Sequence, residues 1–204
     1  MKAKWLPCLL LVGVFVSFSF ADYADGLIDE NEYEYGIIWS NEKLTLVVDG
    51  GGADIIEMEG ASKLEVYSTS EPVNDNWNTG GITDIVLVHS SHLDYLGGST
   101  EEITVGNSAT ATLKGGRLDY LTSMQRNITT THIDLYCQTD WDWVYTNSTI
   151  TGITGHWWDG DSFDIILVNE SGYDPTWKNI KIITPEPATL ALFGLGGLLI
   201  RKRR

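Results

Sequence analysis

Short runs of β-forming residues, punctuated by glycine pairs, constrain the fold of this chain more than any other feature. The segment HLDYL at residues 92–96 returns as RLDYL at residues 117–121, 25 positions later. Looser copies stand at residues 132–136 and 63–67, and two glycine pairs separate the first two copies. A period near 25 residues with glycine corners is typical of one coil of a parallel β-solenoid.

The expected secondary structure is all-β. No 11-residue window carries a convincing helical period, whereas short runs rich in Val, Ile, Thr, Tyr and Leu recur between turn residues. The expected strands are residues 35–39, 44–49, 54–58, 63–67, 84–89, 92–96, 102–105, 109–113, 117–121, 132–136, 143–145, 149–153, 163–168 and 178–183. This pattern favours a parallel β-solenoid over residues 40–136, with a sandwich-like cap from residue 137 on. A two-sheet β-sandwich is the alternative.

The first 21 residues have the three parts of a secretory signal peptide. Lys2 and Lys4 form a basic start, residues 6–18 are apolar, and Ser19-Phe20-Ala21 is a small-x-small cleavage site. We therefore expect an N-terminal signal helix that signal peptidase removes before Asp22.

The other end of the chain has a proline pair, an apolar stretch and a basic cluster. Pro185-Glu186-Pro187 precedes 13 uncharged residues, 188–200. As a helix these would rise roughly 20 Å, short of the hydrocarbon core of about 30 Å, although flanking residues can offset such a mismatch. The chain ends in four basic residues that would stay in the cytoplasm: Arg201, Lys202, Arg203 and Arg204. We expect a transmembrane helix here, with the body outside.

This C-terminal segment resembles the PEP-CTERM sorting signal of Gram-negative and related bacteria. The resemblance covers about the last 20 residues. It implies that exosortase, a membrane protease or transpeptidase, recognises Pro185, Glu186 and Pro187 and removes the tail. It further implies a protein sorted to the cell envelope, the cell surface or the medium, with only transient membrane anchoring.

The charge of the body excludes some partners. Between residue 22 and residue 185 the chain has 27 acidic and 7 basic residues, a net charge of −20. Binding to nucleic acid or to anionic lipid needs a basic face, so neither is expected. Cations and neutral polymers such as glycans remain compatible with this charge.

Four tryptophans are candidates for ligand binding. They alternate with aspartates in the last third of the body, and an exposed indole beside a carboxylate can stack on a sugar ring. The four are Trp141, Trp143, Trp157 and Trp158. This pattern supports an alternative function as a carbohydrate-binding module, for which an exopolysaccharide would be the partner. The simpler interpretation is a tryptophan-rich core or cap.

No metal or other cofactor is expected. Residues 49–56 match one calcium-binding nonapeptide repeat in part, with Asp54 as its acidic residue. Asp159 and Asp161 also offer the oxygen ligands that Ca²⁺ prefers. Such repeats bind calcium between successive coils, so a single copy is weak evidence for a calcium site. The simpler interpretation of these aspartates is an acidic turn on a solvated face.

One cysteine remains in the body. Cys8 lies in the expected signal peptide, which leaves Cys137 without a partner for an intramolecular disulfide. We expect Cys137 to be a small buried side chain.

These observations divide the chain into a signal peptide (1–21), an extracellular β-rich domain (22–184) and a sorting segment (185–204). The leading functional hypothesis is a non-enzymatic envelope or extracellular-matrix protein that exosortase processes. A secreted hydrolase is a further alternative, since carboxylates are abundant, but the chain has no nucleophile motif.

Overall fold

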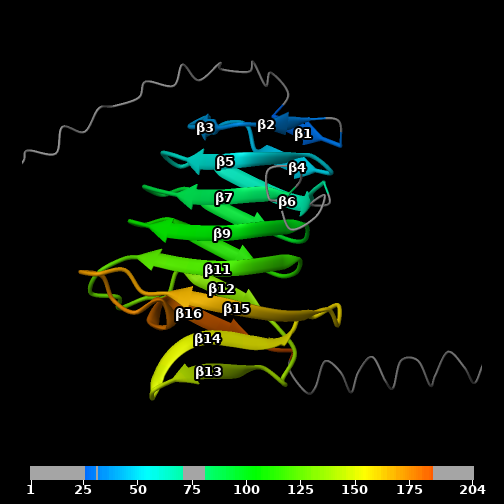
Figure 1. Ribbon diagram of the computed structural model, residues 1–204. Helices are drawn as coiled ribbons and strands as arrows, with labels where there is room; N and C mark the ends of the chain where they lie inside the picture. Colours follow the sequence, from blue (N-terminus) through cyan, green and yellow to red (C-terminus); the bar gives the residue numbers. More distant parts are fainter. Residues whose placement is uncertain (1–25, 31, 71–80, 186–204) are drawn as a thin grey trace, which may run out of the picture.

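Two β-sheets make up most of the structure. The computed structural model describes residues 26–30, 32–70 and 81–185 (Figure 1). The first sheet has seven strands, in spatial order β1 (Leu27–Asp29), β4 (Leu46–Asp49), β6 (Lys63–Ser68), β8 (His92–Tyr95), β10 (Thr110–Leu113), β12 (Ile133–Tyr136) and β16 (Ile180–Ile183). The second has nine, in order β13 (Asp142–Thr146), β14 (Thr149–His156), β15 (Ser162–Val168), β11 (Arg117–Met124), β9 (Ser99–Gly106), β7 (Ile82–Leu87), β5 (Gly52–Met58) and β2 (Tyr33–Glu34), with β3 (Ile37–Trp39) also paired to β5.

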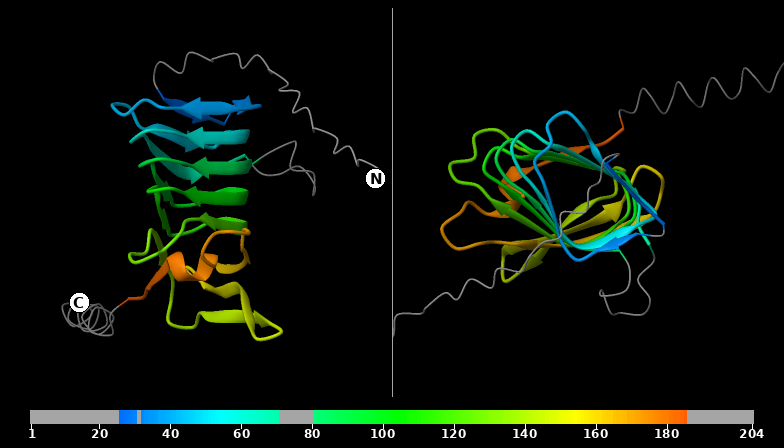
Figure 2. Two further views of the ribbon diagram at one scale, coloured as in Figure 1. Left: turned by 90° about the vertical axis from the view of Figure 1, so that its left-hand side faces the viewer. Right: turned by 90° about the horizontal axis from the view of Figure 1, so that it is seen from above.

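From β4 to β12 the chain alternates between the sheets at every strand. Each strand then pairs with the strand two positions later in the sequence, and all of these pairs are parallel. Figure 2 shows the result from the side and from above: the strands stack along one axis, and the two sheets face each other. The all-β prediction is confirmed, and the pairing is largely parallel.

The strand register corrects the predicted repeat. Thr110 pairs with His92, and Arg117 pairs with Ser99, each 18 positions apart. The two strongest copies, at residues 92–96 and 117–121, lie in different sheets, so their spacing of 25 does not measure a turn of the chain. The looser copy at residues 63–67 does lie next to residues 92–96, because Lys63 pairs directly with His92. The copies resemble each other because each β-strand needs alternating apolar residues.

The core between the sheets is built from rows of apolar side chains, almost all of them aliphatic. In the second sheet, one row runs across five paired strands, and every member is buried: Ile56, Ile85, Ile103, Leu121 and Leu167. The corresponding row of the first sheet contains Val48, Val66, Tyr95, Leu113 and Leu135. Because parallel partners superpose residue on residue, each apolar position extends the core of the strand before it.

Antiparallel pairs appear after residue 137, the part of the chain for which the sequence predicts a sandwich-like cap. β13 and β14 form an antiparallel hairpin that extends the second sheet beyond β15. β13 is the edge strand, and its register shifts between Val144 and Tyr145. A bulge on an edge strand disrupts the regular hydrogen-bonding pattern that another chain could extend.

Each expected strand from residues 35–39 to 178–183 overlaps an observed one. β1 and β2 were not expected, because residues 22–35 are acidic and lack a strong β pattern. The expected signal helix and C-terminal transmembrane helix lie outside the described residues. Within the described part of the chain, no helix has the length and apolar character needed to cross a membrane.

Candidate functional site

The sorting segment follows directly from the last strand. β16 ends at Ile183, whose carbonyl oxygen accepts a hydrogen bond from the Cys137 backbone amide at 3.1 Å. Pro185 is the last described residue. The other predicted motif and tail residues lie outside the described part: Glu186, Pro187, Arg201, Lys202, Arg203 and Arg204. The folded body therefore reaches the segment without an intervening linker.

The four candidate tryptophans do not form one exposed platform. Trp157 is fully buried: its indole Nε1 donates to the Gly116 carbonyl oxygen at 2.8 Å, and its ring packs on Phe163 with centroids 4.4 Å apart. This position leaves no face of Trp157 for a sugar. Its side chain instead fills the core, as the simpler interpretation of the tryptophan pattern expects.

The remaining three tryptophans are more exposed than Trp157. Trp141 and Trp143 are partly buried against the core and meet edge to face, with centroids 5.5 Å apart. Trp158 is 48% exposed and contacts Tyr136 edge to face, and its Nε1 donates to the Cys137 carbonyl oxygen at 2.9 Å. Of the four, only Trp158 presents a large part of its ring to solvent.

Carboxylates line the outer side of the second sheet. We call this surface the acidic face; its members are Asp54, Asp84, Glu101, Glu102 and Asp119. Asp84 and Glu102 are direct partners on adjacent strands. Hydroxyl groups hold two of these carboxylates. The Tyr33 hydroxyl donates to Asp54 at 2.6 Å, and the Thr122 hydroxyl donates to Glu102, also at 2.6 Å.

The acidic face shifts the ionisation of its members. Partial burial raises the pKa of Asp84 above its ordinary value of 3.8, and the neighbouring charges of Glu102 and Asp54 raise it further. The pKa of Glu101 is raised by burial and then by the charges of Asp84, Asp119 and Glu102. Both shifts mean that burial, and then repulsion between neighbouring carboxylates, disfavours the charged forms of these groups in the folded chain.

The calcium candidates lie in two separate places. Asp54 belongs to β5, whereas Asp159 and Asp161 belong to the turn between β14 and β15, where the Asp161 backbone amide donates to Asp159 Oδ1 at 3.1 Å. No three His, Cys, Asp or Glu side chains within the described ranges are grouped so that they could hold a metal ion.

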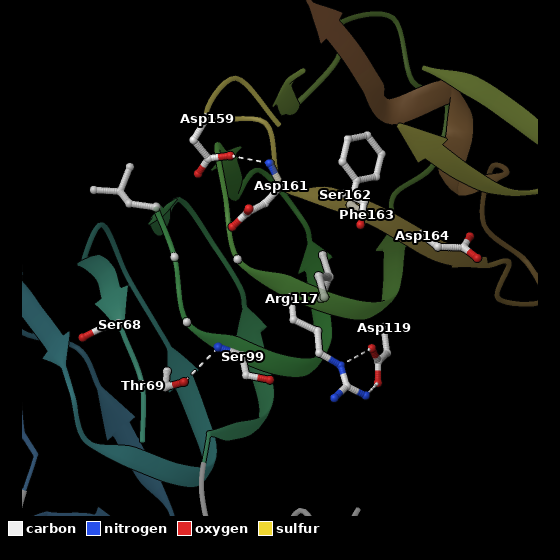
Figure 3. Close-up of a pocket in the computed structure, with 15 residues that line it drawn as sticks. Ser68, Thr69, Ser99, Arg117, Asp119, Asp159, Asp161, Ser162, Phe163 and Asp164 are labelled. Carbon is white, nitrogen blue, oxygen red and sulfur yellow. Dashed lines mark hydrogen bonds and ion pairs between the residues drawn. The ribbon is translucent and has the colours of Figure 1, made fainter. Parts of the chain in front are cut away.

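A cleft of about 720 Å³ opens where several turns meet (Figure 3). The turns after β8 and β10 and the turn before β15 contribute to its wall. Asp159 and Asp161 line it, together with residues that the sequence did not single out: Ser99, Arg117, Asp119 and Asp164. Figure 3 shows Asp159 and Asp161 on one side of the cleft and the Arg117–Asp119 pair on another.

Polar contacts fix the walls of this cleft. Arg117 donates to Asp119 through both Nε and Nη2, each at 3.1 Å, a fork-like geometry that sets the orientation of both groups. The Ser99 backbone amide donates to the Thr69 hydroxyl at 2.8 Å. Arg117 and Asp119 belong to the RLDYL segment at residues 117–121, but nothing in that segment marks them as site residues. The signal that could have brought Ser99 beside Arg117 is a spacing of 18 between paired strands.

Residues 184–204 match the family of the PEP-CTERM protein-sorting motif. No curated protein and no solved structure matches the chain. The match covers the C-terminal segment, confirms the resemblance seen in the sequence, and indicates export to the cell envelope or surface with exosortase as the processing partner.

Proposed function

We propose that this chain is a non-enzymatic protein of the cell envelope or extracellular matrix, built as a short parallel β-solenoid and released from its membrane tail by exosortase. The observation that carries this proposal is the sorting motif at residues 184–204, which begins directly after β16 ends at Ile183. All described strands of the body precede the motif. Removal of the tail would therefore leave the body intact as the part delivered outside the cell.

The alternation of strands supports the solenoid. From β8 to β10, two strands and two turns take 18 residues and return the chain to the same sheet one strand further along, where Thr110 pairs with His92. Repetition of this step lengthens the structure along one axis, as in solenoid proteins. The antiparallel β13–β14 hairpin lies at one end of the stack.

The acidic face supports a role as a surface. Its carboxylates come from successive strands of a regular sheet and are held by hydroxyls of the same sheet, as for Glu102 and Thr122. This arrangement, on a body of net charge −20, favours contact with cations or neutral polymers over nucleic acid and anionic membranes. The acidity also favours solubility once the tail is removed.

Export needs both ends of the chain. Residues 1–21 would direct secretion and be removed by signal peptidase, and residues 188–200 would hold the body at the membrane until exosortase acts. Residues 201–204 would keep the end of the chain in the cytoplasm. The mature protein would then begin near Asp22 and end near Pro185.

Mass spectrometry of the protein recovered from its native host tests this proposal. We expect surface or medium fractions to contain chains that lack residues 1–21 and residues 190–204. Glu186→Ala should cause accumulation of the uncut form in the membrane fraction. Glu170→Ala is the matched control, because Glu170 is exposed on the body and lies outside the motif; its processing should be unchanged. Recovery of intact residues 190–204 from the medium would reject the proposal.

A further inference from the structure

The cleft at the turns has a composition that the sorting function does not explain. We propose that it binds a neutral saccharide, with hydroxyl groups of the sugar donating to the aspartates of its wall. This inference concerns the exported body and goes beyond the proposed function, since a chain can be sorted without binding a sugar.

The size and position of the cleft suit a short oligosaccharide. Its volume of about 720 Å³ falls in the range of small-ligand pockets, about 300–1,000 Å³. The turn that carries Asp159 and Asp161 lies beside the turn after β10: a Cβ atom added at Gly115 would lie 3.6 Å from Asp159 Oδ2. The wall therefore combines separate parts of the chain that the rigid stack of strands holds in place.

The lining offers mainly acceptors with a few donors. Asp159, Asp161 and Asp164 contribute carboxylate oxygens, and Ser162 contributes a hydroxyl that can both donate and accept. The Arg117 guanidinium, oriented by its two hydrogen bonds to Asp119, adds a positive charge to the wall. A sugar carries many hydroxyls, each of which donates once and also accepts, so it can match both kinds of group.

Ser99 supplies an independent observation. Only 9% of this residue is exposed, and its Oγ has no hydrogen-bond partner within the described structure. Figure 3 shows this hydroxyl directed toward the side of the cleft where Arg117 lies. A buried hydroxyl without a partner costs stability, so a ligand hydroxyl that reaches it would provide the missing bond.

The charges of the wall argue against other ligand classes. Four aspartates against one arginine repel phosphates and acidic sugars. A metal ion needs ligands that converge on one point, and the aspartates of the described wall do not form such a group. Ammonium ligands would be attracted by the aspartates but repelled by the positive charge of the Arg117 guanidinium.

Binding can be measured with the full chain in detergent, first on an array of neutral oligosaccharides and then by calorimetry with the best one. We expect Asp164→Ala to weaken binding about five- to tenfold, because one hydrogen bond is lost. Asp164→Asn keeps an acceptor oxygen and should weaken it less than Asp164→Ala. Glu170→Ala, which removes an exposed charge outside the cleft, should bind like the unchanged protein.

Ser99→Ala provides a second readout, because it separates binding from folding. Removal of an unpartnered buried hydroxyl should leave the unfolding midpoint unchanged or raise it, while saccharide affinity falls about fivefold. Failure of every neutral oligosaccharide on the array to bind would overturn the proposal. Binding that Asp164→Ala and Ser99→Ala both leave unchanged would also overturn it. Binding of spermidine instead, lost equally in Asp164→Asn and Asp164→Ala, would show that the cleft is a cation site.

Discussion

The indole Nε1 of Trp157 donates to the backbone carbonyl oxygen of Gly116 at 2.8 Å, across 41 positions of sequence. This bond joins the turn that follows β14 to the turn that precedes β11, so it fastens the antiparallel hairpin to the parallel stack. It lies at the same meeting of turns as the cleft, which both Gly116 and the turn before β15 help to line.

Trp157→Phe should lower the free energy of unfolding by about 1–3 kcal/mol, because the Gly116 carbonyl loses its donor and the smaller ring leaves a void in the core. Urea denaturation of the full chain measures this loss. Trp143→Phe is the matched control, since Trp143 is only partly buried; it should cost less than Trp157→Phe. Equal losses would contradict the role given to the Trp157 bond.

Gly116→Ala should cost about 3 kcal/mol of unfolding free energy, because conformational strain and a backbone clash combine. Gly116 has a φ of +82°, and a Cβ atom there would lie 2.7 Å from the Gly98 carbonyl oxygen. Gly160→Ala isolates the first effect: its φ is +102°, but the nearest atom, Gln138 Nε2, is 3.8 Å away. This control should cost about 1 kcal/mol. A thermal melt of both variants separates the two contributions.

Asp84→Asn should stabilise the protein at pH 7 and flatten its pH profile. The pKa of Asp84 is raised above 3.8 in the folded state, so the folded chain binds this proton more tightly than the unfolded chain does. Its contribution is most favourable below pH 3.8 and is lost as pH rises through the raised value. Unfolding free energies between about pH 3 and pH 7 measure this slope. A variant less stable than the unchanged protein at pH 7 would contradict the view that burial and neighbouring charges disfavour the ionised Asp84 side chain.

Lys63→Met should destabilise the protein at pH 7 and have less effect at low pH, whereas Asp84→Asn should stabilise it at pH 7. Hydrogen bonds to Glu65 and Asp94, at 2.7 and 3.0 Å, raise the pKa of Lys63 above 10.5, and the hydrogen bond from Lys63 lowers the pKa of Glu65 below 4.5. The stabilisation is therefore present between pH 4.5 and pH 10.5 and is lost as pH falls through the lowered Glu65 value or rises through the raised Lys63 value. The pair is partly exposed, so we expect a loss of about 0.5–1 kcal/mol at pH 7, and a smaller loss at low pH in the same denaturation series.

Cys137 should resist alkylation in the folded protein. Burial raises the pKa of its thiol to about 11, and the charge of Asp140 adds to this shift. Only the thiolate reacts rapidly, so iodoacetamide at about pH 8 should leave Cys137 unmodified in buffer and modify it in urea. Peptide mapping by mass spectrometry gives the extent of modification; fast reaction without urea would show that the site opens to solvent.

Strand positions were largely predictable because they depend on local patterns. Runs such as residues 63–67 alternate polar and apolar residues, and turn residues such as Gly60 precede them. The two missed strands, β1 and β2, pair with β4 and β5 although their own sequence is acidic. Their structure therefore depends on the neighbouring strand more than on intrinsic propensity.

The candidate site was less predictable, because similarity between segments does not identify neighbours. Residues 92–96 and 117–121 look alike, yet the structure places them in different sheets. The sequence singles out Asp159 and Asp161 as calcium candidates, whereas Ser99 gives no signal and Arg117 appears only within a strand-like repeat. The tryptophan pattern places Trp157 and Trp158 in one group, although Trp157 is buried and Trp158 is exposed.

The sequence by itself determined the β-rich character of the body, the short strands and the sorting motif, since each is written in adjacent residues. The tertiary structure alone decided the pairing of Ser99 with Arg117, the burial of Trp157 and the meeting of turns that forms the cleft. These features depend on which strands lie side by side, and that choice follows from packing one shared core across distant parts of the chain.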